Sequence, residues 1–246
     1  MAKESSAQLL DPYEKYIPYL FEVRKRLVFT VGVFLIASIL GFFYYERIVT
    51  MILNFLHLGG VNVVFTSPFQ FFTLAINSGF VVGLIVVFPL LILQILTFIK
   101  PALKAKEFKL ILLLLPFSLL LFIFGFGFGI SVMRYVISIF YQKSVELQIG
   151  NMLDIELLLS KIVITGALMG IAFQFPIVMT VLLRLKVIKY KYFVQQRPMA
   201  YIIALFFVLL LPPTDIMSDI ILTLPLVILF ELTLILNRIV LKSHLL

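Results

Sequence analysis

The sequence contains no cysteine and no tryptophan, and only two histidines, among 246 residues. Without cysteine the chain forms no disulfide and offers no thiolate to a substrate or a metal ion. The two histidines, His57 and His244, are far apart in the sequence, so a histidine-based metal site is not expected. The sequence therefore predicts a protein without a metal ion or another cofactor.

Charge is also scarce. Only 13% of the residues are charged and 63% are hydrophobic, whereas a soluble domain has about 25% charged residues. This composition predicts an integral membrane protein with little room for a soluble domain. The polar start, residues 1–18, lacks the apolar segment of a cleavable signal peptide and is expected to form a cytoplasmic arm.

Long apolar runs predict a single all-α membrane domain, residues 1–246, with six transmembrane helices. The fifth and sixth expected spans are short, and an apolar stretch at Met51–Leu58 is expected to form an interfacial helix. The spans are expected at about residues 27–45, 69–99, 110–133, 161–185, 199–211 and 220–237.

Several prolines lie at the start of these apolar runs or inside them. Ser67 and Pro68 are expected to cap and open the second helix, because serine is a good N-cap and proline fits the first helical turn. Pro89, Pro176 and Pro225 lie inside spans and are expected to kink them, because proline removes a helix hydrogen bond.

Three spans contain two glycines four residues apart. Small residues at this spacing let helix backbones approach closely. We expect them to pack helices within the chain, with a seam between chains as the alternative. The pairs are Gly79/Gly83, Gly125/Gly129 and Gly166/Gly170.

The basic residues are distributed unevenly between alternate loops. Sixteen Lys and Arg residues fall on the side of the two termini and four on the other side. The positive-inside rule therefore places both termini in the cytoplasm. The same bias explains the net charge of +8 without any nucleic-acid partner.

Two of the basic cytoplasmic segments each contain one carboxylate. Glu22 lies beside Arg24 in the stretch YLFEVRKRL, and Glu107 lies among the lysines of Lys100–Lys109. Local charge balance explains both, for example a helical pair between Glu22 and Arg26. Alternatively, the two carboxylates each accept a guanidinium group from a ligand, in the bidentate geometry that lysine cannot reproduce. Spacing does not decide whether the two residues meet.

Few polar residues lie at membrane depth. Gln174 could satisfy carbonyl groups freed by Pro176 or bond to a partner helix, and Glu231 could pair with Arg238 or a loop lysine. The chain has no hydrolase or metalloprotease motif and no phosphate-binding glycine loop, so we expect no enzyme activity. A six-span transporter of small solutes or ions remains the alternative, although few polar residues would line its transport path.

Several stretches together resemble the TatC family, the multispanning subunit of the twin-arginine protein translocase. Their order and spacing across six spans carry the likeness, although Gln174 stands where many members have Glu. The stretches are YLFEVRKRL, the SPF of Ser67–Phe69, PLLILQILTFIKPAL from Pro89, ALMGIAFQFPIVMTVLL from Ala167, PPTDIMSD from Pro212, and LPLVILFE ending at Glu231.

The resemblance implies a receptor for folded cargo proteins that carry an N-terminal Arg-Arg signal peptide, driven by the proton-motive force. By the same resemblance, the signal peptide is bound by Glu22, Glu107, Arg24 and Phe98.

The resemblance further implies small single-span partners of the TatA/TatB type, and a homo-oligomer within a hetero-complex. The plasma membrane is the expected location, with an organellar membrane as the alternative. The implied partner contacts are Gln174, Pro212, Pro213 and Asp215.

Overall fold

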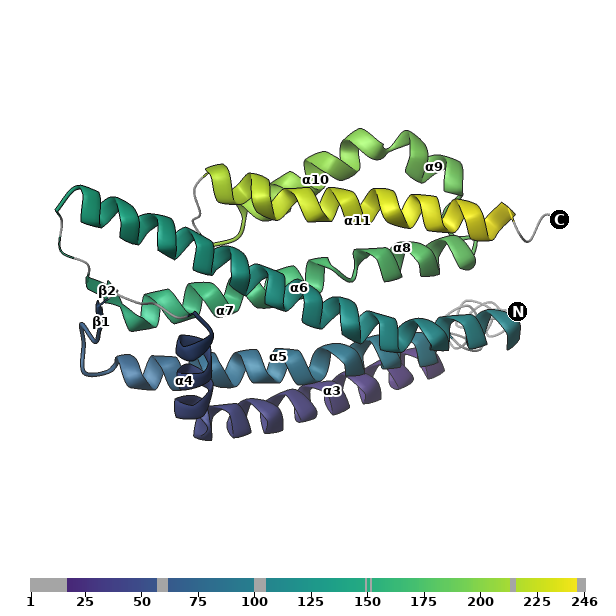
Figure 1. Ribbon diagram of the computed structural model, residues 1–246. Coiled ribbons are helices and arrows are strands. Elements are labelled where there is room, and N and C mark those ends of the chain that lie inside the picture. Colours follow the sequence, from purple (N-terminus) through teal and green to yellow (C-terminus); the bar gives the residue numbers. More distant parts are fainter. Residues whose placement is uncertain are drawn as a thin grey trace, which may run out of the picture.

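The computed structural model describes residues 17–56, 62–99, 105–148, 150, 152–212 and 216–242, and most of them are helical (Figure 1). The described part of the chain also contains two strands of three residues each. The elements in chain order are α3 (Ile17–Phe43), α4 (Tyr45–Leu56), β1 (Asn62–Val64), α5 (Gln70–Ile99), α6 (Ala105–Glu146), β2 (Met152–Asp154), α7 (Ile155–Ala172), α8 (Phe175–Arg184), α9 (Tyr190–Gln195), α10 (Arg197–Leu209) and α11 (Ile216–Lys242).

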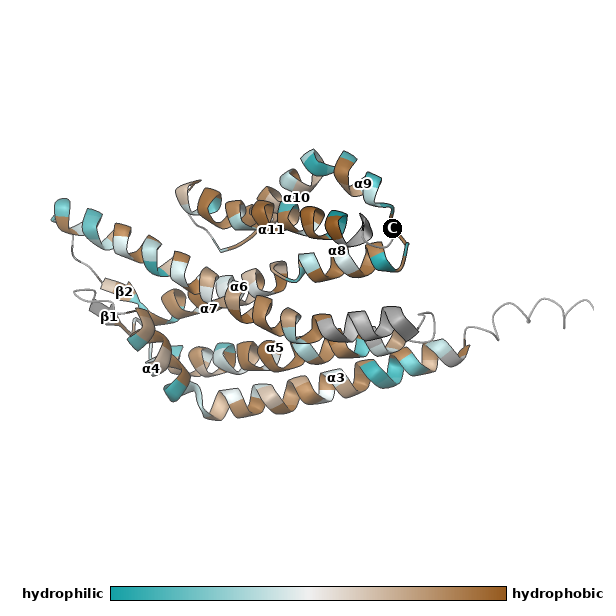
Figure 2. Ribbon diagram, turned by 45° about the vertical axis from the view of Figure 1, so that its right-hand side comes forward, coloured by the Kyte–Doolittle hydropathy of each residue, from teal (hydrophilic) through white to brown (hydrophobic). Residues whose placement is uncertain are grey.

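The apolar helices confirm an all-α membrane protein. Five segments in the described part of the chain are long and apolar enough to cross a bilayer, with α7 and α8 counted as one segment. The 13-residue helix α10 is a shorter apolar helix, so the arrangement is compatible with six spans. Hydrophobic residues run along the helices, and hydrophilic ones gather near their ends (Figure 2).

Several helices differ in length from the expected spans. Helix α6 has 42 residues and continues past residue 133 to Glu146. Helix α11 has 27 residues, so the sixth helix is longer than the expected 220–237. Hydropathy marks the apolar part of a helix, whereas the helix itself continues through the polar residues that flank it.

The three prolines have different effects. Pro176 lies in the first turn of α8, where the expected fourth span is divided into α7 and α8. Because proline has no N–H to donate, the helix is interrupted before it. Pro89 and Pro225 lie inside α5 and α11, which continue without interruption.

The start of α5 also differs from the expectation. The helix begins at Gln70 rather than at Pro68, and the Gln70 N–H donates to the Ser67 carbonyl at 3.3 Å. Ser67 and Pro68 therefore form a turn before the helix rather than its cap and first position.

The external ends of α5 and α7 are joined by a short parallel sheet that the sequence reasoning missed. Asn62 pairs with Met152, and Val64 pairs with Asp154. The Asp154 carboxylate caps α7 by accepting from the Leu157 N–H at 3.0 Å, and it also accepts from the Thr66 hydroxyl and the Gln70 amide. These bonds, that of Thr66 first, lower the pKa of Asp154.

The paired glycines pack helices within the chain, as expected. A Cβ atom on Gly129 of α6 would lie 2.9 Å from the Gly166 Cα of α7. A Cβ atom on Gly79 of α5 would lie 2.5 Å from the Ser38 carbonyl oxygen of α3. Glycine is therefore required at both seams, because any side chain would push the helix backbones apart.

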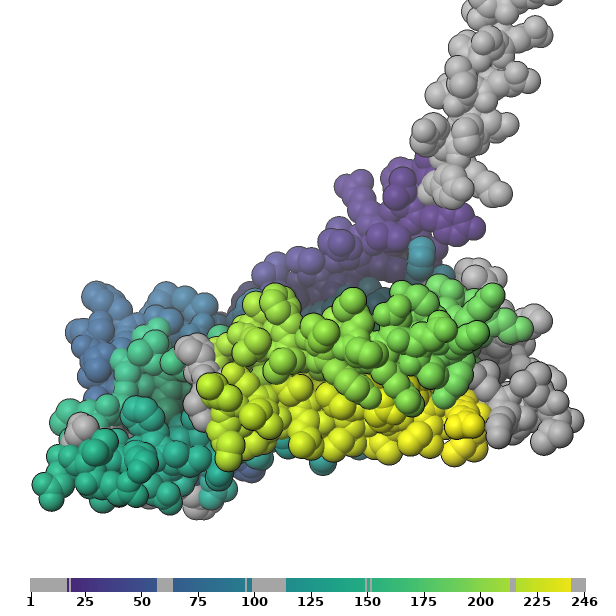
Figure 3. Space-filling view, turned by 90° about the horizontal axis from the view of Figure 1, so that it is seen from above, coloured from purple at the N-terminus to yellow at the C-terminus, as the bar shows by residue number. Residues whose placement is uncertain are grey.

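Helices α9, α10 and α11 form an outer layer on the side of the molecule opposite α3 (Figures 1 and 3). A buried cluster that includes Met169, Phe173, Val208 and Leu222 joins α10 and α11 to α7. Helix α3 begins and α11 ends at the same end of the molecule, and β1, β2 and α4 lie toward the other end (Figure 1).

Candidate functional site

Glu22 and Arg26 form an ion pair on α3, near its first turns. The Arg26 Nη2 and Nε atoms donate to the Glu22 Oε1 atom at 2.5 and 3.1 Å. The Glu22 side chain is 46% exposed and the Arg26 side chain 23% exposed. The local charge pairing that the sequence allowed is therefore present.

Arg26 also joins α3 to the last turns of α5. Its Nη1 atom donates to the Gln94 carbonyl oxygen at 2.7 Å, and its Cζ atom lies 5.9 Å from the centre of the Phe98 ring. The Thr30 hydroxyl donates to the Gln94 side-chain oxygen at 2.7 Å. One guanidinium thus touches a carboxylate, a carbonyl and an aromatic face, which are groups that suit this cation.

Arg26 and Gln94 were not among the expected site residues. The pairing of Arg26 with Glu22 was visible as a spacing of four, but the approach of residues 68 apart in the chain was not. Arg24 is exposed and forms no ion pair in the described part of the chain.

Glu107 lies in the first turn of α6, which begins at Ala105, six residues after α5 ends at Ile99. Since Arg26 bonds to the last turns of α5, positions 22 and 107 lie at the same end of the molecule (Figure 1). The Glu107 side chain is outside what the structure describes, so the meeting of the two carboxylates stays a prediction.

Gln174 lies at the junction of α7 and α8 and is 4% exposed. Its oxygen accepts from the Ser118 hydroxyl at 2.5 Å, and its amide donates to the carbonyl oxygens of Ser118 and Gly170 at 3.0 and 3.4 Å. The Gln174 N–H itself turns to the Ile171 carbonyl, so its side chain serves a carbonyl at the helix break before Pro176. The Gln174 side chain is therefore bonded within the chain, while its service to a carbonyl freed by Pro176 and its contact with a partner helix both stay predictions.

The sequence and the fold are both similar to those of known proteins. The family model described as Sec-independent protein translocase protein (TatC) matches residues 18–225. The chain belongs to the TatC family. It is thus a component of the Sec-independent protein translocase and, as its apolar helices and bacterial relatives agree, a multi-pass protein of the plasma membrane.

Two relatives and one solved structure show how far the likeness extends. The TatC of Listeria innocua is 26% identical over 227 residues, which is 89% of each chain. TatCy of Bacillus subtilis is 26% identical over 228 residues, covering 90% of this chain and 88% of its own. A crystal structure of the twin arginine translocase receptor TatC in DDM has a TM-score of 0.77 at 28% identity, over 88% of this chain and 98% of its own.

The turn between α10 and α11 is only partly described. Pro212 follows α10, whereas Pro213 and Asp215 lie outside the described residues. Their proposed contact with a partner stays a prediction.

Glu231 pairs with a residue that the sequence reasoning did not choose. Its carboxylate lies 3.0 Å from Arg197 Nη2 and accepts from the Tyr201 hydroxyl at 2.5 Å. Neither Arg238 nor a lysine is its partner in the described part of the chain. Arg197 and Tyr201 are four residues apart on α10, and the packing of α10 against α11 brings both to Glu231. Among the described residues, no group of three acidic or histidine side chains could hold a metal ion.

Proposed function

We propose that this TatC-family chain is the receptor for twin-arginine signal peptides and the core of a translocase that exports folded proteins, driven by the proton-motive force and without enzyme activity of its own. Glu22 and Glu107 each accept one guanidinium group of the signal peptide. Arg24 and Phe98 lie in the same region and complete the site.

The observation that carries this proposal is that Glu22 already binds a guanidinium group. Both bonds from Arg26 end on Oε1, and the side chain is 46% exposed. A carboxylate has about four lone-pair positions on its two oxygens, so Glu22 retains capacity for a second guanidinium group or for an exchange of partners. The nearby Phe98 ring supplies a face on which a guanidinium group can stack.

The other subunits are proposed to be single-span proteins of the TatA/TatB type, with several copies of this chain in the same complex. Helix α10 supports such a contact because a row of its apolar side chains is exposed, with no described segment over them. Pro212, Pro213 and Asp215 follow this helix in the sequence, and Gln174 is buried at the junction of α7 and α8. The exposed side chains are Ile202, Ile203, Phe206, Leu209 and Leu210.

The test measures binding of a synthetic twin-arginine signal peptide to the purified chain in detergent. Glu22→Gln and Glu107→Gln are each expected to weaken binding about tenfold or more, because each removes a charge-assisted hydrogen bond. A twin-lysine peptide should bind the wild-type chain as weakly, since lysine lacks the planar fork.

The control is Glu146→Gln, which removes another exposed carboxylate at the opposite end of the molecule, where it pairs with Lys143 at 2.6 Å. This variant should bind the peptide normally. Unchanged binding by a folded Glu22→Gln/Glu107→Gln double variant would refute the site.

A further inference from the structure

A cavity lies between α8, α9, α10 and α11 on the outer layer of the molecule. Its volume is about 380 Å³, within the roughly 300–1,000 Å³ of pockets that hold small molecules. Its walls are almost wholly apolar and include Phe175, Phe207 and Phe230. The residues at its mouth, Tyr192, Met199 and Ile203, are 54%, 53% and 60% exposed. In a membrane this mouth opens toward the lipid chains.

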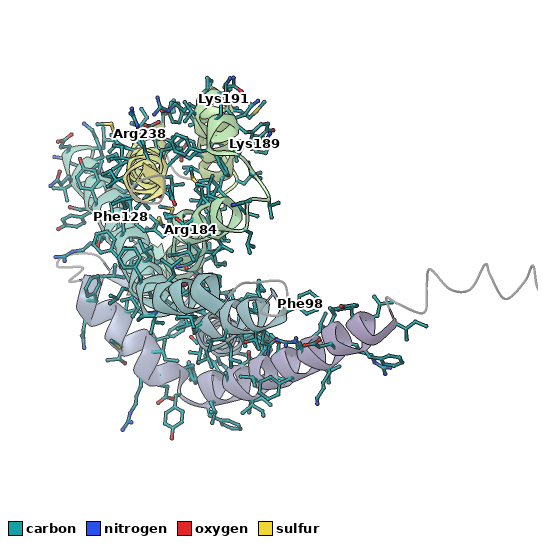
Figure 4. All side chains as sticks on the ribbon, turned by 90° about the vertical axis from the view of Figure 1, so that its right-hand side faces the viewer. Phe98, Phe128, Arg184, Lys189, Lys191 and Arg238 are labelled. Atoms are coloured by element: carbon teal, nitrogen blue, oxygen red, sulfur yellow. The ribbon has the colours of Figure 1, made fainter. Side chains whose placement is uncertain are left out.

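Cations surround the cytoplasmic end of the same helices. Figure 4 looks onto that end, where Arg184, Lys189, Lys191 and Arg238 group around the ends of α8, α9 and α11, apart from Phe98 on the side of α3 and α5. Lys189 and Lys191 are exposed and flank Tyr190 at the start of α9, the short helix whose Tyr192 and Phe193 line the cavity.

Arg197 begins α10 and is next in sequence to residues of the apolar cavity. Gln196 and Met199 line the cavity, as does Tyr201, which shares Glu231 with Arg197. One donor, Nη2, is used on Glu231, and Nε has no hydrogen-bond partner in the described part of the chain. A buried donor without an acceptor is uncommon in a finished structure. Arg184, Lys189, Lys191 and Arg238 form no ion pair among the described residues.

We propose that this cavity binds an anionic phospholipid, with one acyl chain inside the cavity and the phosphate against Arg197, Lys189 and Lys191. The cytoplasmic leaflet supplies such lipids, and basic pockets between membrane helices attract their headgroups. The acyl chain fills apolar space that no described side chain fills. This site is separate from the proposed signal-peptide site on α3, α5 and α6.

A transmembrane partner helix is the other class of occupant, and its dimensions fit poorly. A helix with its side chains is about 10 Å wide, and a spanning helix is about 30 Å long. A cavity of 380 Å³ encloses far less than that, although it accommodates a flexible acyl chain. The rest of the exposed row on α10, which is Ile202, Phe206, Leu209 and Leu210, remains available to a partner helix.

The absence of tryptophan makes a direct test possible. The variant Phe207→Trp places the only tryptophan in the cavity wall, and Phe206→Trp places it on the neighbouring, 62% exposed position of the same helix. Each purified variant is reconstituted into vesicles that contain brominated phosphatidylglycerol or brominated phosphatidylcholine, and quenching of the fluorescence is measured. Ile203→Trp at the mouth serves as a second reporter if Phe207→Trp does not fold.

We expect brominated phosphatidylglycerol to associate at least about threefold more strongly than brominated phosphatidylcholine near residue 207, and about equally near residue 206. Lys189→Gln/Lys191→Gln should bring the preference at 207 down to about one, because each cation near the surface contributes about 1 kcal/mol of attraction to an anionic lipid. The control Lys143→Gln, at the opposite end, should leave it unchanged. Equal quenching by the two lipids at 207 would overturn the proposal, as would the absence of quenching there, which would mean that protein closes the cavity.

Discussion

Arg26 already occupies part of Glu22, the carboxylate proposed to bind a signal-peptide arginine. It donates twice to the Glu22 carboxylate and once to the Gln94 carbonyl, and its guanidinium lies beside Phe98. The Arg26 guanidinium therefore makes the contact with Glu22 that is proposed for an arginine of the signal peptide. In the proposed site, a peptide arginine would therefore compete with Arg26 for the carboxylate or share it.

Competition leads to a prediction for Arg26→Gln. An exposed helical ion pair is worth roughly 0.3–0.5 kcal/mol, so removing Arg26 should tighten binding of a twin-arginine peptide about twofold. The measurement is a peptide titration on the purified chain, with Lys143→Gln as a control for the loss of one positive charge. Weaker binding by the folded Arg26→Gln variant would instead make Arg26 a part of the peptide site.

Asp154 leads to a prediction about pH. Its hydrogen bonds, that of Thr66 first, lower its pKa in the folded protein. A lowered folded-state pKa contributes stability above the unfolded-state pKa of about 3.9, and that stability is lost as the pH falls through the folded-state value. Asp154→Asn keeps a good N-cap but loses the charge.

The melting temperatures of wild type and Asp154→Asn are therefore expected to differ at pH 7 and to converge as the pH falls below about 4. Thermal unfolding in detergent between these values measures the difference. A gap that stays constant over the whole range would show that the charge of Asp154 does not stabilise the fold.

Sequence reasoning reached only part of the site. Glu22 stood out because it is an acid among cations, and its pairing with Arg26 followed from helical spacing. The contact of Arg26 with Gln94 and Phe98 depends on how α3 packs against α5, which no local pattern specifies. Gln174 stood out as an amide at membrane depth, but its partner Ser118 lies 56 residues away on α6.

At the scale of elements, helix seams depend on glycine at particular positions. On α6, a Cβ atom at Gly129 would lie 2.9 Å from the Gly166 Cα and 3.0 Å from the Thr165 carbonyl oxygen, whereas a Cβ atom at Gly127 would meet nothing within 4 Å. Gly129 and Gly127 lie on the same helix, but only Gly129 faces α7. The two positions are therefore a matched pair for testing the seam.

Gly129→Ala is expected to destabilise the protein by about 1–3 kcal/mol, because overpacking forces backbone shifts. Gly127→Ala should be neutral or slightly stabilising, because alanine favours a helix over glycine by up to about 1 kcal/mol. Denaturant unfolding in detergent compares the two. Equal effects at both positions would contradict the role of Gly129 in the seam.

The elements also show where periodicity and hydropathy stop being informative. The existence of the apolar helices and the 13-residue length of α10 were predictable from the runs of hydrophobic residues. The extension of α6 to Glu146 was not, because Arg134 interrupts the apolar run and the end of the helix, from Gln142, is mostly polar. Strands β1 and β2 have three residues each and pair across about 90 positions, so no local alternation reveals them.

For the whole molecule, the uneven distribution of basic residues indicates which end faces the cytoplasm, and the start of α3 and the end of α11 both lie at that end. The end that carries the start of α3 and the end of α11 also carries most of the lysines and arginines in the described part of the chain, which the positive-inside rule assigns to the cytoplasm. Helix α10, at about 1.5 Å per residue, spans only about 20 Å of a hydrocarbon core about 30 Å thick. This mismatch favours local thinning of the bilayer or a partner that covers the helix.

The absence of cysteine allows the orientation to be tested with single substitutions. Lys189→Cys at the start of α9 and Lys143→Cys near the end of α6 replace exposed side chains at opposite ends of the molecule. In intact cells, a membrane-impermeant maleimide should label Lys143→Cys, while Lys189→Cys should react only after the membrane is opened. The unsubstituted chain, which has no thiol, is the control for background. The reverse pattern would invert the protein in the membrane and place Glu22 on the side that folded cargo reaches only after export, so the proposed receptor function would fail together with the orientation.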